Sequence, residues 1–493
     1  MSNRVFPQQF LQKIESQLGD QYSDFIYSQN CDPTISIRLN HNKQPSPPLD
    51  NQHDVVPWCT DGLYLKDRPS YITDPLFHAG CYYSQEPSSM IISQLLDNSE
   101  PIRVLDMCAA PGGKTLVLAD YLHPHSLIVA NEFDGKRVGK LVENTVRWGR
   151  DNILVTHNRP SDFGAGELCE EFDLVLVDAP CSGEGMFRKD QFAVDQWSPK
   201  LIGECVSRQK DILFYSLSTL KIGGKLIYST CTYNAEENEE IVGWMVEQFG
   251  LQVLQCEIPL EWGISETADG CYHCYPHKTR GEGLFFAVLE KIAPTPEVIE
   301  KHGEKNNYFK QRSANYKELN QVKKTEYLDE FASWVGELKH PVTYFQIEQN
   351  FYMTQAAHFG FVQLLHDSLF IKKYPLKIGE KAKGKGFSSV NTGSKSFVFT
   401  PDHEFSQSQL LLDDHQNEPQ NRTYNRVEIS KIEAIKFLSK QEIIADLVGA
   451  IPDGFILLTH SHIPIGWAKK VDSRLQNLLP KGLMIRSSII DLL

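Results

Sequence analysis

The chain has 493 residues, of which 41% are hydrophobic, 11% aromatic and 23% charged, which is typical of globular domains and excludes a disordered tail or a collagen-like fibre. No apolar run approaches the roughly 18 residues of a membrane-spanning helix, so we expect no membrane association. The formal net charge of −14 argues against a protein that coats nucleic acid non-specifically, because phosphate binding depends on clustered Lys and Arg.

The cysteine content and the first residues indicate the compartment. The 11 cysteines are scattered and odd in number, which fits a reducing environment in which thiols stay free. The opening residues, MSNRVFPQQF, lack the apolar stretch of a secretory signal. We therefore expect a cytoplasmic protein.

Shifts in composition divide the chain into four regions, in line with the three to four domains that its length predicts. Region 1–85 begins with an amphipathic helix over 10–18, which a loop rich in Pro and Asn follows. Region 86–292 alternates short β-branched runs with helical periods. Region 293–400 begins as a polar, Lys-rich linker and continues as a mixed segment, and region 401–493 alternates like the strands of a small barrel.

The second region predicts an α/β fold with a doubly wound, mostly parallel sheet. The predicted helix from Leu201 to Leu220 keeps helical spacing, and Gly223 and Gly224 are expected to cap its end. The predicted strands cover residues 102–107, 126–131, 152–157, 173–178, 225–230 and 284–290.

The end of the first predicted strand carries the sharpest local motif, CAAPGGK at 108–114. Small residues and two glycines allow a tight turn before a helix N-terminus, where a ligand can approach main-chain N–H groups. Glu132 follows Gly113 by 19 residues, a position suited to accept hydrogen bonds from ribose hydroxyls. The motif therefore predicts a nucleoside site. A phosphate-binding loop is a weaker interpretation of this motif, because Cys108 stands where that loop has glycine. A turn with a structural role and no ligand is the other alternative.

Two further strands end beside a cysteine, Cys181 in DAPCSGEG and Cys231 in STCTYN. A lone buried cysteine is usually only a small hydrophobic residue. Both of these cysteines lie in turns at the sheet edge that holds the nucleoside site, where a thiolate can act as a nucleophile. Methylation of C5 of a pyrimidine needs such a thiolate, because C5 becomes nucleophilic only after a nucleophile adds to C6. Enzymes that methylate amino groups usually have an aromatic residue at the end of the corresponding acidic-Pro-Pro-aromatic loop. This chain has Cys181 at that position.

Five blocks of the sequence resemble, in the same order, motifs of the NOL1/NOP2/Sun family of RNA 5-methylcytosine methyltransferases. Bacterial family members that modify 16S rRNA are also similar at PIGWAKK (464–470) and LLPKGLMIR (478–486), in a PUA-like domain. The five blocks are YYSQEPSSM (82–90), CAAPGGK (108–114), DAPCSGEG (178–185), STCTYNAEEN (229–238) and YPHKTRGEGLFF (275–286).

This resemblance implies a Rossmann-like S-adenosylmethionine-dependent methyltransferase sheet with an N-terminal α+β segment and a C-terminal PUA-like β-barrel domain. The four regions would then be an N-terminal RNA-binding segment (1–85), a catalytic domain (86–292), a linker and pre-PUA segment (293–400) and a PUA-like RNA-binding domain (401–493). The implied reaction is methylation of C5 of a cytosine in 16S rRNA, at cytosine 1407, through a covalent cysteine–C6 adduct.

The resemblance also assigns roles to residues. Cys231 is expected to be the nucleophile, and Cys181 to assist release of the methylated product. Asp178 is expected beside both the cofactor and the flipped cytosine, and Glu132 at the cofactor ribose. The residues expected around the amino-acid portion of S-adenosylmethionine are Cys108, Ala109, Ala110, Pro111, Gly112, Gly113 and Lys114.

Some positions depart from the family pattern or carry a weaker assignment. Where the family has an Asp near the adenine, this chain has Arg159, with Asp162 three residues later, so Asp162 or main chain alone would hold the adenine. Lys189 is a weak candidate for a substrate contact. Cys271 and Cys274, with His273 and His277, form a single CxxC without a second pair, so we expect no metal.

The expected partner is 16S rRNA or the small ribosomal subunit, and the expected oligomeric state is a monomer, which the sequence does not fix. The Lys-rich stretch 371–386 is either a solvated loop or an RNA contact that includes Lys381, Lys383 and Lys385. Another rRNA or tRNA cytosine, a non-catalytic RNA-binding protein for ribosome assembly, and an ATPase remain alternatives. Cys181 together with Cys231 disfavours the assembly protein, and Cys108 disfavours the ATPase.

Overall fold

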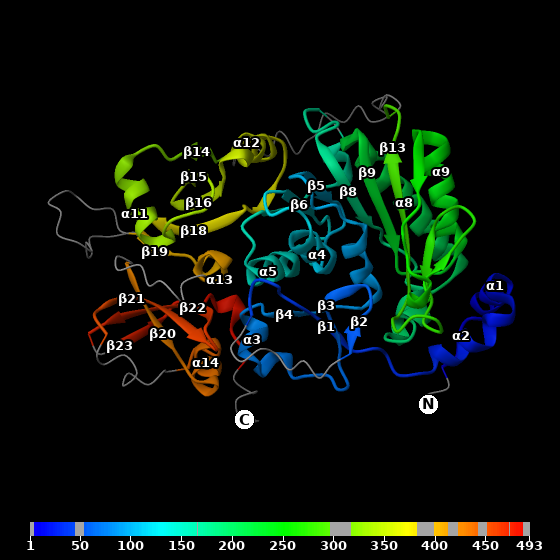
Figure 1. Cartoon of the computed structure of the whole chain (residues 1–493), viewed down its shortest axis with the longest axis horizontal. Coiled ribbons are helices and arrows are strands. Elements are labelled where there is room, and N and C mark those ends of the chain that lie inside the picture. Colours follow the sequence, from blue (N-terminus) through cyan, green and yellow to red (C-terminus); the bar gives the residue numbers. More distant parts are fainter. Residues whose placement is uncertain are drawn as a thin grey trace.

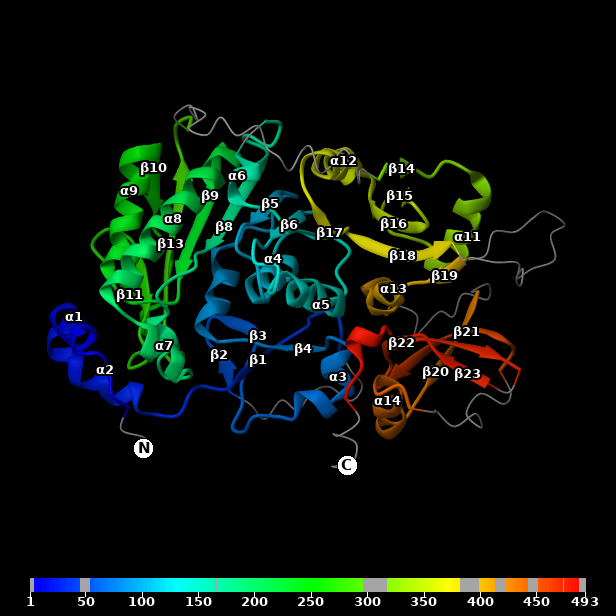
Figure 2. The ribbon, with the colours of Figure 1, turned by 180° about the vertical axis from the view of Figure 1, so that it is seen from behind.

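The computed structural model describes residues 4–44, 54–164, 166–295, 317–381, 399–412, 423–441, 451–472 and 474–486. The described strands form four sheets: one near the N-terminus, a ten-stranded central sheet and two sheets from the last third of the chain. The central sheet has the N-terminal sheet below it and the two later sheets beside it (Figures 1 and 2).

The N-terminal part combines two helices with a small antiparallel sheet of order β2-β3-β1-β4. Helix α1 (Gln8–Leu18) confirms the expected amphipathic helix and buries Phe10 and Ile14, which cluster with Phe187 of the central domain. The remaining elements are α2 (Tyr22–Gln29), β1 (Ser36–Leu39), β2 (Val55–Val56), β3 (Cys59–Tyr64), α3 (Pro75–His78) and β4 (Tyr82–Ser84).

The central sheet contains all six strands that the sequence predicts, which confirms the α/β fold. Five run parallel in the order β7-β6-β5-β8-β9, and β13 lies antiparallel beyond β9. These strands are β5 (Arg103–Asp106), β6 (Leu127–Asn131), β7 (Ile153–Thr156), β8 (Phe172–Asp178), β9 (Leu220–Thr230) and β13 (Leu284–Lys291). The edge beyond β13 adds β10 (Leu251–Leu254), β11 (Ser265–Glu266) and β12 (Tyr272–Cys274).

Helices cover both faces of this sheet because successive strand residues point to opposite sides. Leu105 of β5 packs in the cluster that contains residues of α8 (Pro199–Thr219) and α9 (Glu239–Phe249). Its neighbour Val104 packs instead with residues of α4 (Gly113–Tyr121) and α5 (Val138–Trp148). Two short helices, α6 (Pro160–Phe163) and α7 (Gln191–Gln196), complete the domain.

The expected glycine cap at the end of α8 is wrong. The helix ends at Thr219, and Leu220 is already extended and begins β9. Gly223, which has a positive φ of 79°, and Gly224 lie inside β9, where the pairing with β8 shifts register. A Cβ on Gly224 would lie 2.9 Å from the Lys221 carbonyl oxygen, so the glycines permit a bulge in the strand.

Residues 317–381 and 399–401 form a sheet of order β14-β15-β16-β18-β19 and also extend the central sheet. Strand β17 (Ile371–Lys373) pairs antiparallel with β7. Strand β19 (Phe399–Pro401) spans the boundary that the sequence places between residues 400 and 401. The other elements are β14 (Asn320–Gln321), α11 (Thr325–Val335), β15 (Val342–Ile347), β16 (Asn350–Gln355), α12 (Phe359–Ser368) and β18 (Leu376–Lys381).

The described part of the Lys-rich stretch lies in strands β17 and β18 and not in a solvated loop. Lys373 is buried, and its Nζ lies 2.9 Å from Glu404 Oε1. Lys377 pairs with Asp402 at 2.6 Å. These two lysines therefore form ion pairs that stabilise the fold. Lys381 is exposed, and Lys383 and Lys385 lie outside the described residues.

The last sheet has the order β20-β21-β22-β23 and packs on two other parts of the chain. Trp467 joins a cluster with Trp334 and Phe399 of the preceding sheet, and Ile465 joins one with Ile37 of the N-terminal sheet. The elements are α13 (His403–Gln407), β20 (Tyr424–Glu428), α14 (Lys431–Leu438), β21 (Gly454–His460), β22 (Ile463–Val471) and β23 (Arg474–Asn477). No helix within the described ranges is long and apolar enough to cross a membrane.

Candidate active site

The candidate site lies at the carboxyl ends of the parallel strands, around β5 and β8. From β5 the chain continues outward to β6 and β7, and it then returns to place β8 on the other side of β5. Such a reversal opens a crevice at the strand ends in which α/β proteins bind ligands. The candidate site residues all follow strands that end at this edge: the loop after β5, Glu132 after β6, and the two cysteine loops.

The loop between β5 and α4 makes a tight turn that ends at the N-terminus of α4. Gly112 is the N-cap of α4 and has a left-handed φ of 118°, which side chains disfavour. A Cβ on Gly113 would lie 3.3 Å from Tyr83 Cε1, so this position also suits glycine. Burial raises the pKa of the Cys108 thiol well above its usual value, which keeps this thiol neutral. The expected loop residues thus form a compact turn at a helix N-terminus.

Glu132 lies directly after β6 and closes the same loop. Its Oε2 accepts a hydrogen bond from the Ala110 N–H at 3.3 Å, and its Oε1 accepts one from the Asp134 N–H at 2.7 Å. Arg137 Nη1 lies 3.6 Å from Oε2 and neutralises part of the charge. The buried carboxylate is therefore fixed in place, and each of its oxygens keeps a lone pair for a ligand.

Asp106 and Phe133 are two site residues that sequence reasoning missed. Asp106 is buried at the end of β5, and burial raises the pKa of its carboxyl to about 7. Thr115 donates a hydrogen bond to Oδ2 at 2.6 Å, whereas the buried Oδ1 has no partner among the described residues. Phe133 is 56% exposed directly after Glu132. The sequence signal that points to Phe133 is its position directly after Glu132, the candidate ribose-binding residue.

Asp178 ends β8 and connects the two halves of the site. Its Oδ2 lies 2.7 Å from Lys114 Nζ, and its Oδ1 accepts a hydrogen bond from the Ser229 hydroxyl at 2.8 Å. Lys114 belongs to α4 and Ser229 to β9, so one carboxylate joins the loop after β5 to the strand that leads to Cys231. Burial lowers the pKa of Lys114, but the attraction and hydrogen bond of Asp178, together with the nearby Cys231 and Glu86, raise this pKa overall, which keeps the ammonium charged.

The structure brings the two predicted cysteines together. Cys181 Sγ lies 3.1 Å from Cys231 Sγ and accepts a hydrogen bond from the Cys231 N–H at 3.3 Å. The contact with Cys231 and burial raise the pKa of the Cys181 thiol well above its usual value, so Cys181 stays protonated. Both side chains are partly accessible. The pair therefore offers one protonated thiol beside a second sulfur at the same strand edge.

Two buried carboxylates fix the cysteine loops to each other. Glu237 accepts hydrogen bonds from the Ser182 N–H at 3.0 Å and from Gln209 Nε2 at 2.8 Å. Glu184 accepts bonds from the main-chain N–H groups of Tyr233 and Asn234, at 2.8 and 3.0 Å. Each carboxylate thus joins the two loops or their supporting helices. The geometry of the sulfur pair is consequently set by the scaffold.

Gly185 allows the closest approach of the two cysteine loops. Its N–H donates to the Cys231 carbonyl at 2.8 Å. A Cβ at this position would lie 2.9 Å from that carbonyl oxygen and 3.2 Å from the Gly283 carbonyl oxygen. Both neighbours are main chain and cannot rotate away, so only glycine fits without displacing Cys231.

The weaker candidates lie apart from this centre or have structural partners. Asp162 accepts a hydrogen bond from the Arg159 N–H at 2.9 Å and caps α6, and the Arg159 guanidinium lies 5.9 Å from the Phe133 ring centre. Lys189 Nζ lies 3.8 Å from Glu282 Oε1, in the ion pair that Arg188 forms with Glu282 at 2.7 Å.

The cysteines of the CxxC sequence do not face each other. Cys271 packs in the cluster on one side of the central sheet, and Cys274 packs in a different apolar cluster. His273 pairs with Glu239 at 2.6 Å, and His277 lies 3.2 Å from Gln21. No group of three or more His, Cys, Asp or Glu side chains in the described part of the chain is arranged to hold a metal ion.

Comparison with known proteins identifies the family. Residues 93–290 match the model for 16S rRNA methyltransferase RsmB/F, 6–87 match that for the N-terminal domain of 16S rRNA methyltransferase RsmF, and 424–485 match that for the methyltransferase RsmF PUA domain. A ribosomal RNA small subunit methyltransferase F from Erwinia tasmaniensis is 30% identical over 506 residues, which cover 98% of both chains. The chain belongs to the ribosomal RNA small subunit methyltransferase F (RsmF) family.

Other relatives agree with the RsmF assignment. A protein of the same name from Aliivibrio fischeri is 37% identical over 325 residues, which cover 62% of this chain and 68% of the relative. A solved structure of a methyltransferase homologue from Pyrococcus horikoshii is 29% identical, has a TM-score of 0.50, and covers 58% of this chain and 95% of its own. The predicted Rossmann-like methyltransferase sheet, its N-terminal α+β segment and the C-terminal PUA domain are thus confirmed, and the chain is an enzyme of the methyltransferase class.

Proposed function

We propose that the chain methylates C5 of a cytosine in 16S rRNA, at cytosine 1407 as the resemblance implies, with S-adenosylmethionine as the methyl donor. The observation that carries the proposal is the 3.1 Å separation of Cys181 Sγ and Cys231 Sγ at the strand edge that also holds Glu132 and the glycine turn. Methyl transfer to an amino group needs no thiol, whereas C5 of a pyrimidine needs a nucleophile at C6.

The residues present suit S-adenosylmethionine. The amino-acid portion would bind at the turn before the N-terminus of α4, which consists of Cys108, Ala109, Ala110, Pro111, Gly112, Gly113 and Lys114. Glu132 has free lone pairs for the ribose hydroxyls, and the exposed ring of Phe133 beside it offers a face for the adenine. When bound, S-adenosylmethionine supplies the methyl group that C5 receives.

The chain's own residues form and break the covalent adduct with the cytosine. Cys231 Sγ, as a thiolate, adds to C6 of the cytosine and breaks the C5–C6 double bond, which makes C5 nucleophilic. C5 would then take the methyl group as its bond to the donor sulfur breaks and S-adenosylhomocysteine is left. Loss of the C5 proton to a base and breakage of the Cys231–C6 bond regenerate the thiolate and release the product. Cys181, whose thiol stays protonated, assists this release. Asp178, held by Lys114 and Ser229, borders the donor and the N3/N4 edge of the cytosine.

The other regions supply the choice of target. A cytosine must leave its stack to reach the sulfur pair, which costs a few kcal/mol and least in an unpaired segment. We assign RNA binding to the N-terminal segment (1–85), the exposed part of the Lys-rich stretch and the PUA-like domain (401–493), and catalysis to 86–292. The substrate is 16S rRNA or the small ribosomal subunit, bound by a monomer.

The test uses a bacterial strain that lacks its own RsmF-type gene and carries this chain or its Cys231→Ala variant. Bisulfite mapping of 16S rRNA should show one protected cytosine in the strain with the wild-type chain and none with the variant. Protection that persists with Cys231→Ala, or a methyl group on a nitrogen of the RNA, would contradict the proposal.

A further inference from the structure

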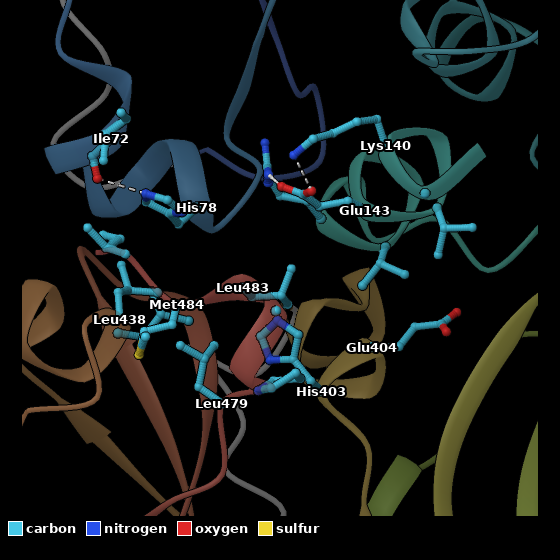
Figure 3. Close-up of a pocket in the computed structure, with 18 of the residues that line it drawn as sticks. Ile72, His78, Lys140, Glu143, His403, Glu404, Leu438, Leu479, Leu483 and Met484 are labelled. Atoms are coloured by element: carbon cyan, nitrogen blue, oxygen red, sulfur yellow. Dashed lines mark hydrogen bonds and ion pairs between the residues drawn. The ribbon is translucent and has the colours of Figure 1, made fainter. Parts of the chain in front are cut away.

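A cavity of about 660 Å³ lies at the junction of three parts of the chain, away from the cysteine pair (Figure 3). His78 of α3 contributes from the N-terminal part, and one side of α5 contributes from the central domain. The C-terminal part adds His403 of α13, Leu438 of α14, and the segment 479–486. The lining includes none of the residues assigned to catalysis or to the methyl donor.

The walls of the cavity combine an apolar surface with three cations and three carboxylates, and Lys373 and Lys377 behind the walls pair with two of those carboxylates, which leaves a local excess of positive charge. Each lining carboxylate already has a cationic partner: Glu143 pairs with Lys140 and Arg147, Asp402 with Lys377, and Glu404 with Lys373. Arg486 adds a further cation, and within the described residues no carboxylate pairs with it. Leu438, Leu479, Leu483 and Met484 supply apolar surface on the C-terminal side. The cavity therefore suits an anionic ligand that has an apolar face.

His403 adds a hydrogen-bonding group to the interior. Figure 3 shows its ring across the cavity from Glu143 and Lys140. Nδ1 lies 3.3 Å from the Ser406 hydroxyl, whereas Nε2 has no hydrogen-bond partner in the described part of the chain. Burial lowers the pKa of His403 to about 4, so the imidazole is neutral at physiological pH. A neutral ring can exchange a hydrogen bond with a polar edge of a ligand without adding charge.

Helix α5 connects the cavity to the cofactor loop. Arg137 donates to the Ala110 carbonyl, and Asn144 Nδ2 donates to the Pro111 carbonyl at 2.8 Å. At 100° per residue, these two side chains project from the side of α5 opposite to Gly139, Glu143 and Val146, which line the cavity. The cavity and the methyl-donor loop are thus separated by the diameter of one helix, about 10 Å.

We propose that this cavity binds one unpaired nucleotide of the rRNA substrate. The aliphatic wall would contact the base face, His403 Nε2 would bond to the base edge, and Lys140 and Arg486 would contact the flanking phosphates. Splayed bases that pack on side chains, with cations along the backbone, are a general mode of single-stranded RNA recognition. The inference rests on the proposed function because it takes the occupant from the same rRNA.

Two glycines allow the cavity to be filled without strain. Gly139 on α5 and Gly482 in the C-terminal segment line the cavity, and a Cβ on either would meet no atom within 4 Å. Gly139→Trp and Gly482→Trp therefore place an indole in the cavity from opposite walls. Gly243 on α9 also has open space around an added Cβ, so Gly243→Trp is the matched control, and Gly139→Ala controls for the backbone change.

The experiment measures binding of the full chain to a single-stranded 16S rRNA fragment by fluorescence anisotropy, with donor binding measured separately by calorimetry. Gly139→Trp and Gly482→Trp should each weaken RNA binding at least tenfold with unchanged donor affinity, and both controls should bind like the wild type. Unchanged RNA binding by the two filled variants would overturn the proposal. The proposal would also be overturned if cytidine or adenosine monophosphate bound in the cavity of the wild-type chain while the filled variants still bound RNA normally.

Methylation of the same RNA separates this inference from the proposed function. Filled variants that methylate with unchanged KM leave the cysteine chemistry intact and overturn the cavity assignment. Conversely, a wild-type chain that binds the RNA through the cavity but forms no 5-methylcytosine supports the cavity assignment and overturns the proposed reaction.

Discussion

Cys181 Sγ and Cys231 Sγ lie 3.1 Å apart, at the ends of neighbouring parallel strands β8 and β9. One pyrimidine ring can therefore contact either sulfur, and geometry alone does not divide the two roles between them. The protonated state of Cys181 favours it as a proton donor in release, and it leaves the bond to C6 to Cys231.

Substitution of each cysteine should therefore give opposite results in a trapping assay. With the methyl donor and labelled RNA present, Cys181→Ala should accumulate a covalent protein–RNA adduct, because release is impaired. Cys231→Ala should form none, because it lacks the attacking sulfur. Denaturing gel electrophoresis detects the adduct, and the reverse pattern would exchange the two roles.

Gly185→Ala should reduce turnover without weakening donor binding. The new Cβ would meet the Cys231 and Gly283 carbonyl oxygens at 2.9 and 3.2 Å, so the Cys231 loop must move. A displacement of about 1 Å can cost 10²-fold in rate. We expect kcat to fall by about that factor, and Gly203→Ala on α8, which has open space, to leave kcat unchanged. Equal activity of the two variants would argue against a fixed cysteine geometry.

Glu132→Gln should weaken binding of the methyl donor. A hydrogen bond to a charged group contributes about 1.5–3 kcal/mol, so the dissociation constant should rise by about 10- to 100-fold. Calorimetry with the donor alone measures this change, and Glu240→Gln on the exposed face of α9 is the control. A variant that binds the donor normally would remove Glu132 from the ribose site.

Asp106→Asn should change how stability depends on pH. The folded-state pKa of about 7 lies above the unfolded value near 4, so only the unfolded chain releases this proton between those values, and the wild type loses stability as pH rises. From pH 5 to 7 the loss is about 2 kcal/mol. The Tm of the neutral variant relative to wild type should therefore rise by about 5 °C over this range, and a constant difference would contradict a raised pKa.

Replacement of Lys381, Lys383 and Lys385 by Glu should weaken RNA binding and reduce its salt dependence. Each lost phosphate contact lowers the slope of log affinity against log salt by about 0.7–0.9. Lys373 and Lys377 are left unchanged because their ion pairs support the fold. Lys200→Glu on α8 is the single-site control for added negative charge, and unchanged affinity of the triple variant at moderate salt would exclude this stretch from the RNA interface.

The sequence predicts the strands of the central sheet well because their signals are local, and the candidate site residues are found by the same local signals. Each strand run is continuous, and the turn at 108–114 and the two cysteine motifs follow strand ends directly. The hydrogen-bond network around Glu184 and Glu237 could not be predicted from the sequence. Its members are distant in sequence, and only the fold brings the Ser182 N–H to Glu237.

Three features required the three-dimensional arrangement. Two lysines of the 371–386 stretch, Lys373 and Lys377, pair with Glu404 and Asp402, which no local pattern indicates. The cavity combines residues from Ile72 to Arg486. The glycines at 223 and 224 fit a helix end and a strand bulge equally well, and the pairing with β8 decides between them.

The antiparallel pairing of β17 with β7 also determines how this protein can be divided into fragments. A truncated chain that stops after β13 contains every residue assigned to catalysis but leaves the main-chain donors and acceptors along β7 uncovered. Unprotected edge strands recruit other strands and promote aggregation. A minimal catalytic fragment should therefore extend through Lys373, and during synthesis the sheet edge becomes complete only after that residue has left the ribosome.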